Sequence, residues 1–438
     1  MRLMGDLKDS ADKFLHRHAY INTLKPKGGK WKEFLATNFS SKNLSQSVVD
    51  VIKFLTLRYP KKTSGRILFV SYSASRVEGL GLSYNRFVYP FTVSNPDCEL
   101  ISIEDGYIKN GLDKNNLKEY NLSIIVFLVR FFIIITKFLG ELLRKRTPRH
   151  DSIILKRYGA QVSAYHLLYK LLIKKVNPSL IVTINWYGAR GLGLNLAAHR
   201  AKVPLVDVQH GLAAESKHRA YLDLQSLDSE LRPDFFLSWS SKDAELLNDQ
   251  YESCVAYDVG NASLMVPPEL QVAGVGLESE EDSILVILGI SIPDWITRII
   301  NFALASHLRL VIRPHPSFPI DELVIKGLGQ NVEVRDGGAL ATCFDKSMIA
   351  AIGEWSAGLL DAVASGIPAF SIGPEGQRDF KSQEGIESYD NIDSFLAVWD
   401  SPDSLKSVKR RTRPYDYLKA GEVVRQILRS QSDNSLNQ

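Results

Sequence analysis

Short runs of aliphatic and β-branched residues alternate with helix-like segments along most of the chain, and this alternation constrains the fold more than any other feature. The runs at residues 66–70 (RILFV), 180–185 (LIVTIN) and 308–313 (LRLVIR) have the length and composition of buried strands. Segments with helical spacing and glycine-containing turns separate these runs. Strands that alternate with helices pair in parallel and are covered on both faces, so the sequence predicts an α/β fold.

The alternation occurs twice, which predicts two Rossmann-like lobes whose parallel sheets face each other across a cleft. A chain of 438 residues is also too long for one ordinary hydrophobic core. We expect an N-terminal lobe at residues 61–230 and a C-terminal lobe at residues 231–430. Residues 1–60 would precede them as a leader, and residues 431–438 would form a disordered tail.

Composition and missing motifs narrow the classes of function. The 53 lysines and arginines nearly balance 49 acidic residues, giving a net charge of +4, so we expect no nucleic-acid partner. The cysteines, Cys98, Cys254 and Cys343, are far apart, which suits a reducing compartment. The sequence contains no HExxH, GxxxxGK[ST] or tight DxD motif, so we expect chemistry without a metal or cofactor. The charged N-terminus lacks the apolar core of a signal peptide and predicts a cytoplasmic protein.

Residues 122–143 are almost entirely apolar, and a basic cluster follows within residues 144–149. The segment is long enough to cross a membrane, but Arg130 and Lys137 make crossing costly and fall on one helical face. Two alternatives remain for residues 122–149. They form either an interfacial helix that holds the protein at the inner face of the cytoplasmic membrane, or a buried helix of the first lobe.

The run at residues 308–313 ends in RPHP, which cannot continue as a strand. Pro314 and Pro316 lack a backbone N–H, so pairing stops and leaves Arg313 and His315 at the carboxyl edge of a sheet with displayed side chains. Ligands bind at this edge in open α/β sheets. A structural hydrogen-bonding role is the alternative for the histidine.

A second group of polar residues follows the strand-like run at residues 347–353. Glu354 and Ser356 come directly after it, and a short helix then ends at Gly366. A serine at a helix start offers a hydroxyl group and free N–H groups that attract phosphate. Asp361, a turn and a half further on, is placed to accept hydrogen bonds from ribose hydroxyls. The alternative for Ser356 is a role as helix cap only, since capping uses the same geometry.

In the first half, Gln209, His210 and Gly211 end the strand at residues 204–208. The 105 positions between the two histidines, His210 and His315, leave room for them to meet across the cleft. The glycine-rich YGARGLG, which contains Gly188 and Arg190, lacks the GxGxxG order of a dinucleotide site, and we expect it to bring a helix start close to the cleft.

The sequence IEDG places Glu104 and Asp105 at the end of another strand, residues 98–104. One of these carboxylates could act as a base, or they could only cap the next element.

Four stretches, in this order, resemble bacterial capsule and lipopolysaccharide glycosyltransferases of the GT-B fold: PLVDVQHGL, PDFFLSWSSKDAELL, LVIRPHPS and EWSAGLLDAVASGIPAFSIG. The RPHP element is similar to the histidine-proline motif of capsular sialyltransferases and of Kdo and glycerophosphate transferases. The resemblance covers residues 178–373. It implies transfer of a sugar from a nucleotide sugar to a glycan or a lipid-linked glycan.

The resemblance also implies roles for single residues. His315 would contact the donor phosphate and help the nucleotide to leave, with added positive charge from Arg313. Ser356 would hold a phosphate, and Asp361 would lie near the ribose. His210 would be the general base or a second phosphate contact.

The identity of the base stays open. In the sialyl- and Kdo-transferase branches an acidic pair and a glycine precede the histidine-proline motif at about the distance that QHG has here, whereas Asp105 lies 210 positions before His315. Other functions also remain open: a nucleotide-sugar 2-epimerase or a glycerophosphate transferase on the same fold, or a two-lobed sugar-binding protein without catalysis.

Overall fold

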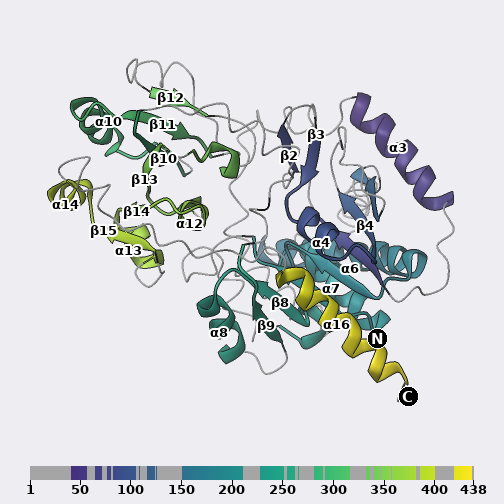
Figure 1. Cartoon of the computed structure of the whole chain (residues 1–438). Coiled ribbons are helices and arrows are strands. Elements are labelled where there is room, and N and C mark those ends of the chain that lie inside the picture. Colours follow the sequence, from purple (N-terminus) through teal and green to yellow (C-terminus); the bar gives the residue numbers. More distant parts are fainter. Residues whose placement is uncertain are drawn as a thin grey trace. The chain divides into compact units, whose positions relative to one another are not determined.

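The computed structural model of the chain divides into two compact units, which are residues 1–76, 82–263 and 416–438, and residues 77–81 and 264–415 (Figure 1). The structure describes residues 41–56, 65–71, 76–79, 82–104, 108, 116–123, 125, 150–210, 227–250, 254–261, 265, 281–289, 292–315, 332–335, 340–345, 347–356, 358–380, 385–399 and 419–436. Each unit contains one parallel sheet, as the alternation in the sequence predicts.

The sheet of the first unit has seven parallel strands in the order β5-β4-β1-β6-β7-β8-β9. Its strands are β1 (Arg66–Val70), β4 (Glu99–Glu104), β5 (Leu117–Asn121), β6 (Leu180–Thr183), β7 (Leu205–Val208), β8 (Phe235–Ser238) and β9 (Val255–Asp258). The chain leaves β1 toward β4 and later returns to its other side with β6. The order of the strands therefore reverses between β1 and β6, where parallel sheets bind ligands at the carboxyl edge.

Alternate residues of β1 enter two separate hydrophobic clusters, one on each face of the sheet. Ile67 and Phe69 pack with α4 (Val88–Ser94) and α16 (Lys419–Leu436) on one face. Leu68 and Val70 pack on the other face with α3 (Ser41–Thr56), α6 (His150–Val176) and α7 (Ala189–Ala201). A third cluster joins α7 to η4 (Ser229–Leu231) and α8 (Ser241–Gln250).

The sheet of the second unit has six parallel strands in the order β12-β11-β10-β13-β14-β15. Its strands are β10 (Ser283–Ile287), β11 (Arg309–Arg313), β12 (Val332–Val334), β13 (Met348–Gly353), β14 (Ala369–Ile372) and β15 (Ile386–Tyr389). Its helices are α10 (Ile296–Ala305), η6 (Leu340–Cys343), α12 (Gly358–Ala364), α13 (Pro374–Phe380) and α14 (Ile392–Val398). A small sheet of β2 (Arg76–Gly79) and β3 (Leu82–Asn85) completes the described strands.

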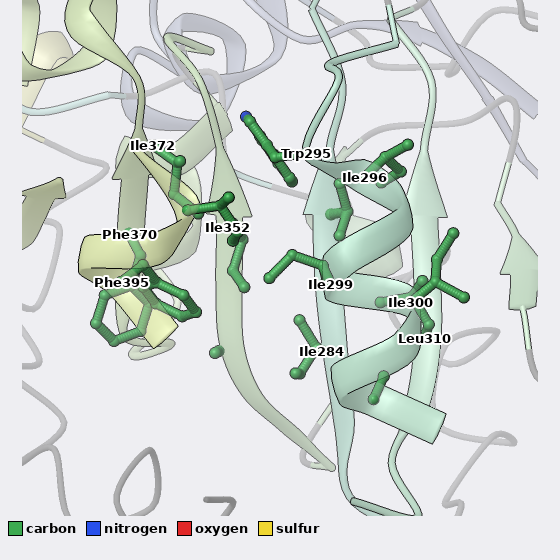
Figure 2. Close-up of a cluster of buried hydrophobic side chains, with 14 of the residues drawn as sticks. Ile284, Trp295, Ile296, Ile299, Ile300, Leu310, Ile352, Phe370, Ile372 and Phe395 are labelled. Carbon is green, nitrogen blue, oxygen red and sulfur yellow. The ribbon is translucent and has the colours of Figure 1, made fainter. Parts of the chain in front are cut away.

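Figure 2 shows the core of the second unit, where α10 lies along the sheet among side chains of β10, β11 and β13. Ile296, Ile299 and Ile300 of α10 are buried there. At one side of the core, the ring of Phe370 lies 5.3 Å from that of Phe395, in an edge-to-face arrangement. Such aromatic pairs add to the stabilisation from apolar burial.

Three predicted boundaries are wrong. The first unit extends to residue 263 instead of 230, because β8 and β9 add to the first sheet rather than start the second. The predicted tail at residues 431–438 is helical as far as Leu436, and α16 belongs to the first unit because it buries Val424 and Ile427 against α4. The predicted leader includes α3, which contributes Phe54 to the core.

The apolar and basic segment predicted at residues 122–149 lies almost wholly outside the described residues. Leu122, at its start, is buried. No helix in the described part of the chain is long and apolar enough to span a membrane.

Two glycines allow α7 to start in close contact with its surroundings. A Cβ at Gly191 would overlap the backbone of Asn185 and Trp186 in the preceding loop. A Cβ at Gly193 would lie 2.6 Å from the Cβ of Tyr165 in α6. The glycine-rich stretch therefore fits α7 against its own loop and against α6. The sequence predicts a different role for this stretch, which is to bring the start of a helix close to a cleft.

We expect Gly191→Ala to lower the free energy of unfolding by roughly 1–3 kcal/mol, the usual range for overpacking. The matched control is Gly188→Ala, where a Cβ would meet only Asn185 Oδ1 at 3.8 Å and stability should change little. Urea denaturation of both variants measures the difference. Equal stability of the two variants would contradict this account of α7.

Candidate functional site

The candidate site of the second unit lies where β10, β11 and β13 end. Ile287, the last residue of β10, pairs with Arg313 on one side and with Gly353 on the other. The order of the strands reverses at β10, so this edge is the position at which open α/β sheets bind ligands. His315 and Glu354 follow strands that are separated by one strand, so their backbones are about 10 Å apart.

The two basic residues of RPHP differ in their surroundings. Arg313 is only 5% exposed, and its Nη1 donates a hydrogen bond to the carbonyl oxygen of Arg335 at 2.8 Å. The expectation that both side chains are displayed is therefore wrong for Arg313. His315 follows the buried Pro314 and is half-buried. Of the two, His315 is the better placed to touch a ligand.

A network of alternating charges supports Arg335. Its guanidinium group lies 2.7 Å from Glu333 and 3.1 Å from Asp345, and Nη1 donates to the carbonyl of Cys343 at 2.6 Å. Burial opposes the charge on Arg335, but the two carboxylates outweigh it and raise its pKa. Arg309 contacts the same carboxylates at 2.9 and 3.2 Å. Sequence reasoning missed this network, although the alternation of Glu333 and Arg335 in VEVRDG places both on one face of a strand.

Ser356 caps α12, the alternative that the sequence left open. The N–H of Gly358 donates to Ser356 Oγ at 3.2 Å, and that of Leu359 donates to the Ser356 carbonyl at 3.0 Å. The helix ends at Ala364, and Gly366 follows two residues later with a φ of +77° that favours glycine, close to the predicted end. Glu354 is half-buried and its carbonyl accepts the Ser371 hydroxyl.

Asp361 lies on α12 and is 8% exposed. A carboxylate at this depth offers little surface to a ribose hydroxyl, because a ligand needs access to its oxygens. Trp355, the residue after Glu354, packs over Gly289, where a Cβ would lie 3.5 Å from the indole ring.

In the first unit, His210 lies beside a tyrosine that the sequence analysis did not single out. Its Nε2 is 3.1 Å from the hydroxyl of Tyr187, and the two rings stack with centroids 5.9 Å apart. The residues come from the ends of the neighbouring strands β7 and β6. The tyrosine can therefore orient the imidazole and exchange a proton with it. The sequence contains a signal that could have identified Tyr187, because this residue follows a strand, as His210 does.

Gln209 and Arg190 were predicted to line a cleft, but both are buried and bound to other elements. Gln209 donates to Asp243 at 2.9 Å and accepts from the N–H of Trp239 at 2.8 Å. Burial raises the pKa of the Asp243 carboxyl. These bonds tie the end of β7 to α8.

The guanidinium group of Arg190 donates to the Tyr169 hydroxyl at 2.6 Å and to the carbonyl of Ser71 at 3.3 Å. It therefore joins α7 to α6 and to the end of β1. Gly188 is the partly exposed N-cap residue of α7. Gly211 lies outside the described residues.

The IEDG stretch contains a buried ion cluster. Asp105, predicted as a base, lies outside the described residues, but Glu104 before it is fully buried and bound to Arg76 at 2.7 Å. Glu119 also pairs with Arg76. Burial raises the pKa of Glu119 to about 7, and the charge of Glu104 adds to the rise while that of Arg76 opposes it. Asn85 donates to Glu104 at 3.0 Å and to Ser71 at 2.9 Å.

We expect wild-type protein to lose stability between about pH 4.5 and pH 7 relative to Glu119→Gln. Glutamate titrates near its ordinary pKa of 4.5 when unfolded and near 7 in the folded protein. The folded state therefore favours the protonated form, and this contribution is complete below pH 4.5 and disappears as the pH rises through 7. Urea denaturation across this range measures it. Parallel pH profiles of the two proteins would contradict the prediction.

Among the described residues, no three His, Cys, Asp or Glu side chains gather in a way that could hold a metal ion. No protein-family model matches the sequence. No curated protein matches it either.

Solved structures do match the fold. The UDP-GlcNAc 2-epimerase of Methanocaldococcus jannaschii, solved with UDP-GlcNAc and UDP, aligns with 83% of this chain and 99% of its own, at 12% identity and a TM-score of 0.53. The Neisseria meningitidis epimerase bound to UDP-GlcNAc aligns with 83% of this chain and 100% of its own, at 10% identity and a TM-score of 0.53. The Rickettsia bellii epimerase aligns with 84% and 97%, at 11% identity and a TM-score of 0.50.

At such low identities the likeness establishes the fold and leaves the activity open. Two Rossmann-like units, each with a parallel sheet and helices, match the architecture of these proteins. The chain therefore has the GT-B fold.

Proposed function

We propose that this protein is a glycosyltransferase that moves a sugar from a nucleotide donor to an acceptor hydroxyl, without a metal or cofactor. The observation that carries the proposal is the position of His315, half-buried at the carboxyl edge where the second sheet reverses its strand order. The resemblance of residues 178–373 to bacterial surface-polysaccharide glycosyltransferases supports the same activity. GT-B proteins of similar fold have been solved with UDP-GlcNAc.

In this mechanism the second unit meets the negative charge that grows on the departing phosphate. His315 would donate a hydrogen bond or a proton to that phosphate, since its ordinary pKa lies near neutrality. Arg313, two residues before it and bonded to the carbonyl oxygen of Arg335, would add positive potential. Ser356 would contribute its hydroxyl. Because Asp361 is buried, Glu354 is the carboxylate better placed to reach the ribose.

The first unit would supply the base. His210 would accept the proton of the acceptor hydroxyl, and Tyr187 would hold the imidazole in position through the 3.1 Å contact. Asp105 remains the alternative base. We propose a glycan or lipid-linked glycan of a bacterial surface polysaccharide as the acceptor, with residues 122–149 in contact with the inner face of the cytoplasmic membrane.

A 2-epimerase of nucleotide sugars is the second candidate. The observation in its favour is that the epimerases align over 97% or more of their own length. An epimerase needs no acceptor, whereas a transferase releases its nucleotide only when an acceptor takes the sugar. The two activities therefore differ in what happens to the donor alone.

We expect one nucleotide among CMP, CDP, UDP and GDP, or its sugar conjugate, to raise the melting temperature of the protein, because a ligand that binds only the folded state stabilises it. The selected nucleotide sugar is then incubated with and without glycan acceptors. Nucleotide release that depends on an acceptor supports the transferase. A new epimer formed without acceptor would contradict the transferase and support the epimerase. A melting temperature raised by free sugars alone would favour a binding protein.

We expect His315→Ala to reduce turnover by roughly 100-fold or more, the usual contribution of a general acid or base. The melting temperature should stay the same, since a half-buried side chain at a strand end adds little to the core. The matched control is His199→Ala on the exposed side of α7, which should keep full turnover. Equal activity of both variants would contradict the assignment of this site.

A further inference from the structure

Exposed apolar side chains are concentrated on two helices of the first unit. Ten large hydrophobic side chains are exposed among the described residues, and six of them lie on α3 and α6. The four on α3 and two on α6 are Val48, Val49, Ile52, Leu55, Leu167 and Leu171. Leu171 is 67% exposed and Leu55 is 59% exposed. Scattered apolar residues are normal on a surface, but a cluster of them marks an interaction site.

The two helices run in the same direction on the same face of the sheet. Near the start of α3, the Ser47 hydroxyl donates to the carbonyl of Asn121 at the carboxyl end of β5. At the other end of α3, the Leu55 carbonyl accepts from Lys175 Nζ at 2.8 Å, in the last turn of α6. The helix α6 in turn leads into the amino end of β6. The Lys175 side chain therefore links the last turn of α6 to the last turn of α3.

The contact between Lys175 and Leu55 gives the two helices a common reference point along their lengths. Ile52 and Val48 lie three and seven residues before Leu55, while Leu171 and Leu167 lie four and eight residues before Lys175. Residues three and four apart fall on one helix face. Leu168 of α6 and Val51 of α3 pack into the same buried cluster below. The exposed residues thus lie on two helices that cover the same face of the sheet, and we call these six side chains the apolar strip.

Lysines border this strip. Among the described side chains of α3 and α6, no aspartate or glutamate is exposed. Lys53 of α3 and Lys170 and Lys174 of α6 are exposed. The acidic residue among 45–56 is Asp50, which is 9% exposed and accepts the N–H of Asn121 at 3.1 Å. Residues 161–176 contain no acidic residue. A lysine has an apolar stem and a charged end, so it can lie beside an apolar strip while its ammonium group contacts an anion.

We propose that the α3/α6 face, defined by these six apolar residues and three lysines, docks on an anionic lipid bilayer. Apolar side chains flanked by lysines are the pattern of helices that lie in a membrane interface, where the side chains enter the acyl boundary and the lysines meet the lipid phosphates. The surface is defined on α3 and α6, whereas the membrane contact proposed above uses residues 122–149. It also lies outside the candidate site, so it stands whether or not the protein transfers sugars.

The test is flotation of the full-length protein with vesicles of phosphatidylcholine, alone or mixed in equal parts with phosphatidylglycerol. We expect binding to the mixed vesicles, weakened by raised salt, and little binding to neutral ones. Ile52→Ser with Leu171→Ser should lower the partition coefficient on the order of tenfold, through lost apolar area. Lys170→Gln with Lys174→Gln should lower it on the order of twentyfold, at about fivefold for each charge.

Matched controls carry the same changes elsewhere. Leu304→Ser with Val398→Ser removes two exposed apolar side chains of the second unit, and Lys202→Gln with Lys242→Gln removes two exposed lysines. Both controls should bind as wild type does.

Three results would overturn the proposal. The first is equal binding of the α3/α6 variants and their controls, and the second is equal binding to neutral vesicles. The third is a wild-type protein that binds no vesicles and sediments as a dimer, while the variant with Ile52→Ser and Leu171→Ser sediments as a monomer. This result would assign the face to self-association.

Discussion

The parallel pairing of every strand in the two large sheets is the constraint on which the rest of the structure depends. Strands buried on both faces are mostly apolar along their length. Parallel pairing also puts all carboxyl ends at one edge of each sheet. The polar residues that follow the strands therefore gather there, and each must either find a partner or face a ligand. The candidate residues His315, His210 and Tyr187 lie at those edges.

Most polar residues at these edges have a structural role. Arg313, Arg190, Gln209 and Glu104 are buried and bound to partners from other elements. They hold strand ends, helices and loops in place, so that the few remaining side chains keep fixed positions. His315 and the His210–Tyr187 pair differ because they are half-buried. A small number of contact residues supported by a bound framework is what preorganised sites require.

The strands and the position of the edges could be predicted from the sequence, because both follow from local patterns. The run at 308–313 became β11 (Arg309–Arg313), and Ser356 and Gly366 bound α12 as their residue types indicate. The burial of Arg313 could not be predicted, since its partner Arg335 lies 22 positions away, beyond a stretch without a local signal. The same holds for Glu104 and Arg76. Partners chosen through tertiary packing leave no trace in periodicity.

The return of α16 to the first unit has a consequence for how the protein is made. The N-terminal unit buries Val424 and Ile427 against α4, so the cover of this face of its sheet is complete only when α16 has been synthesised. The second unit is encoded between the two parts of the first and contains its own core. On the ribosome, the unit that is synthesised later can thus finish folding earlier. The first unit completes its core only after α16 has been synthesised, and until then the part of its core that α16 covers is open to chaperones.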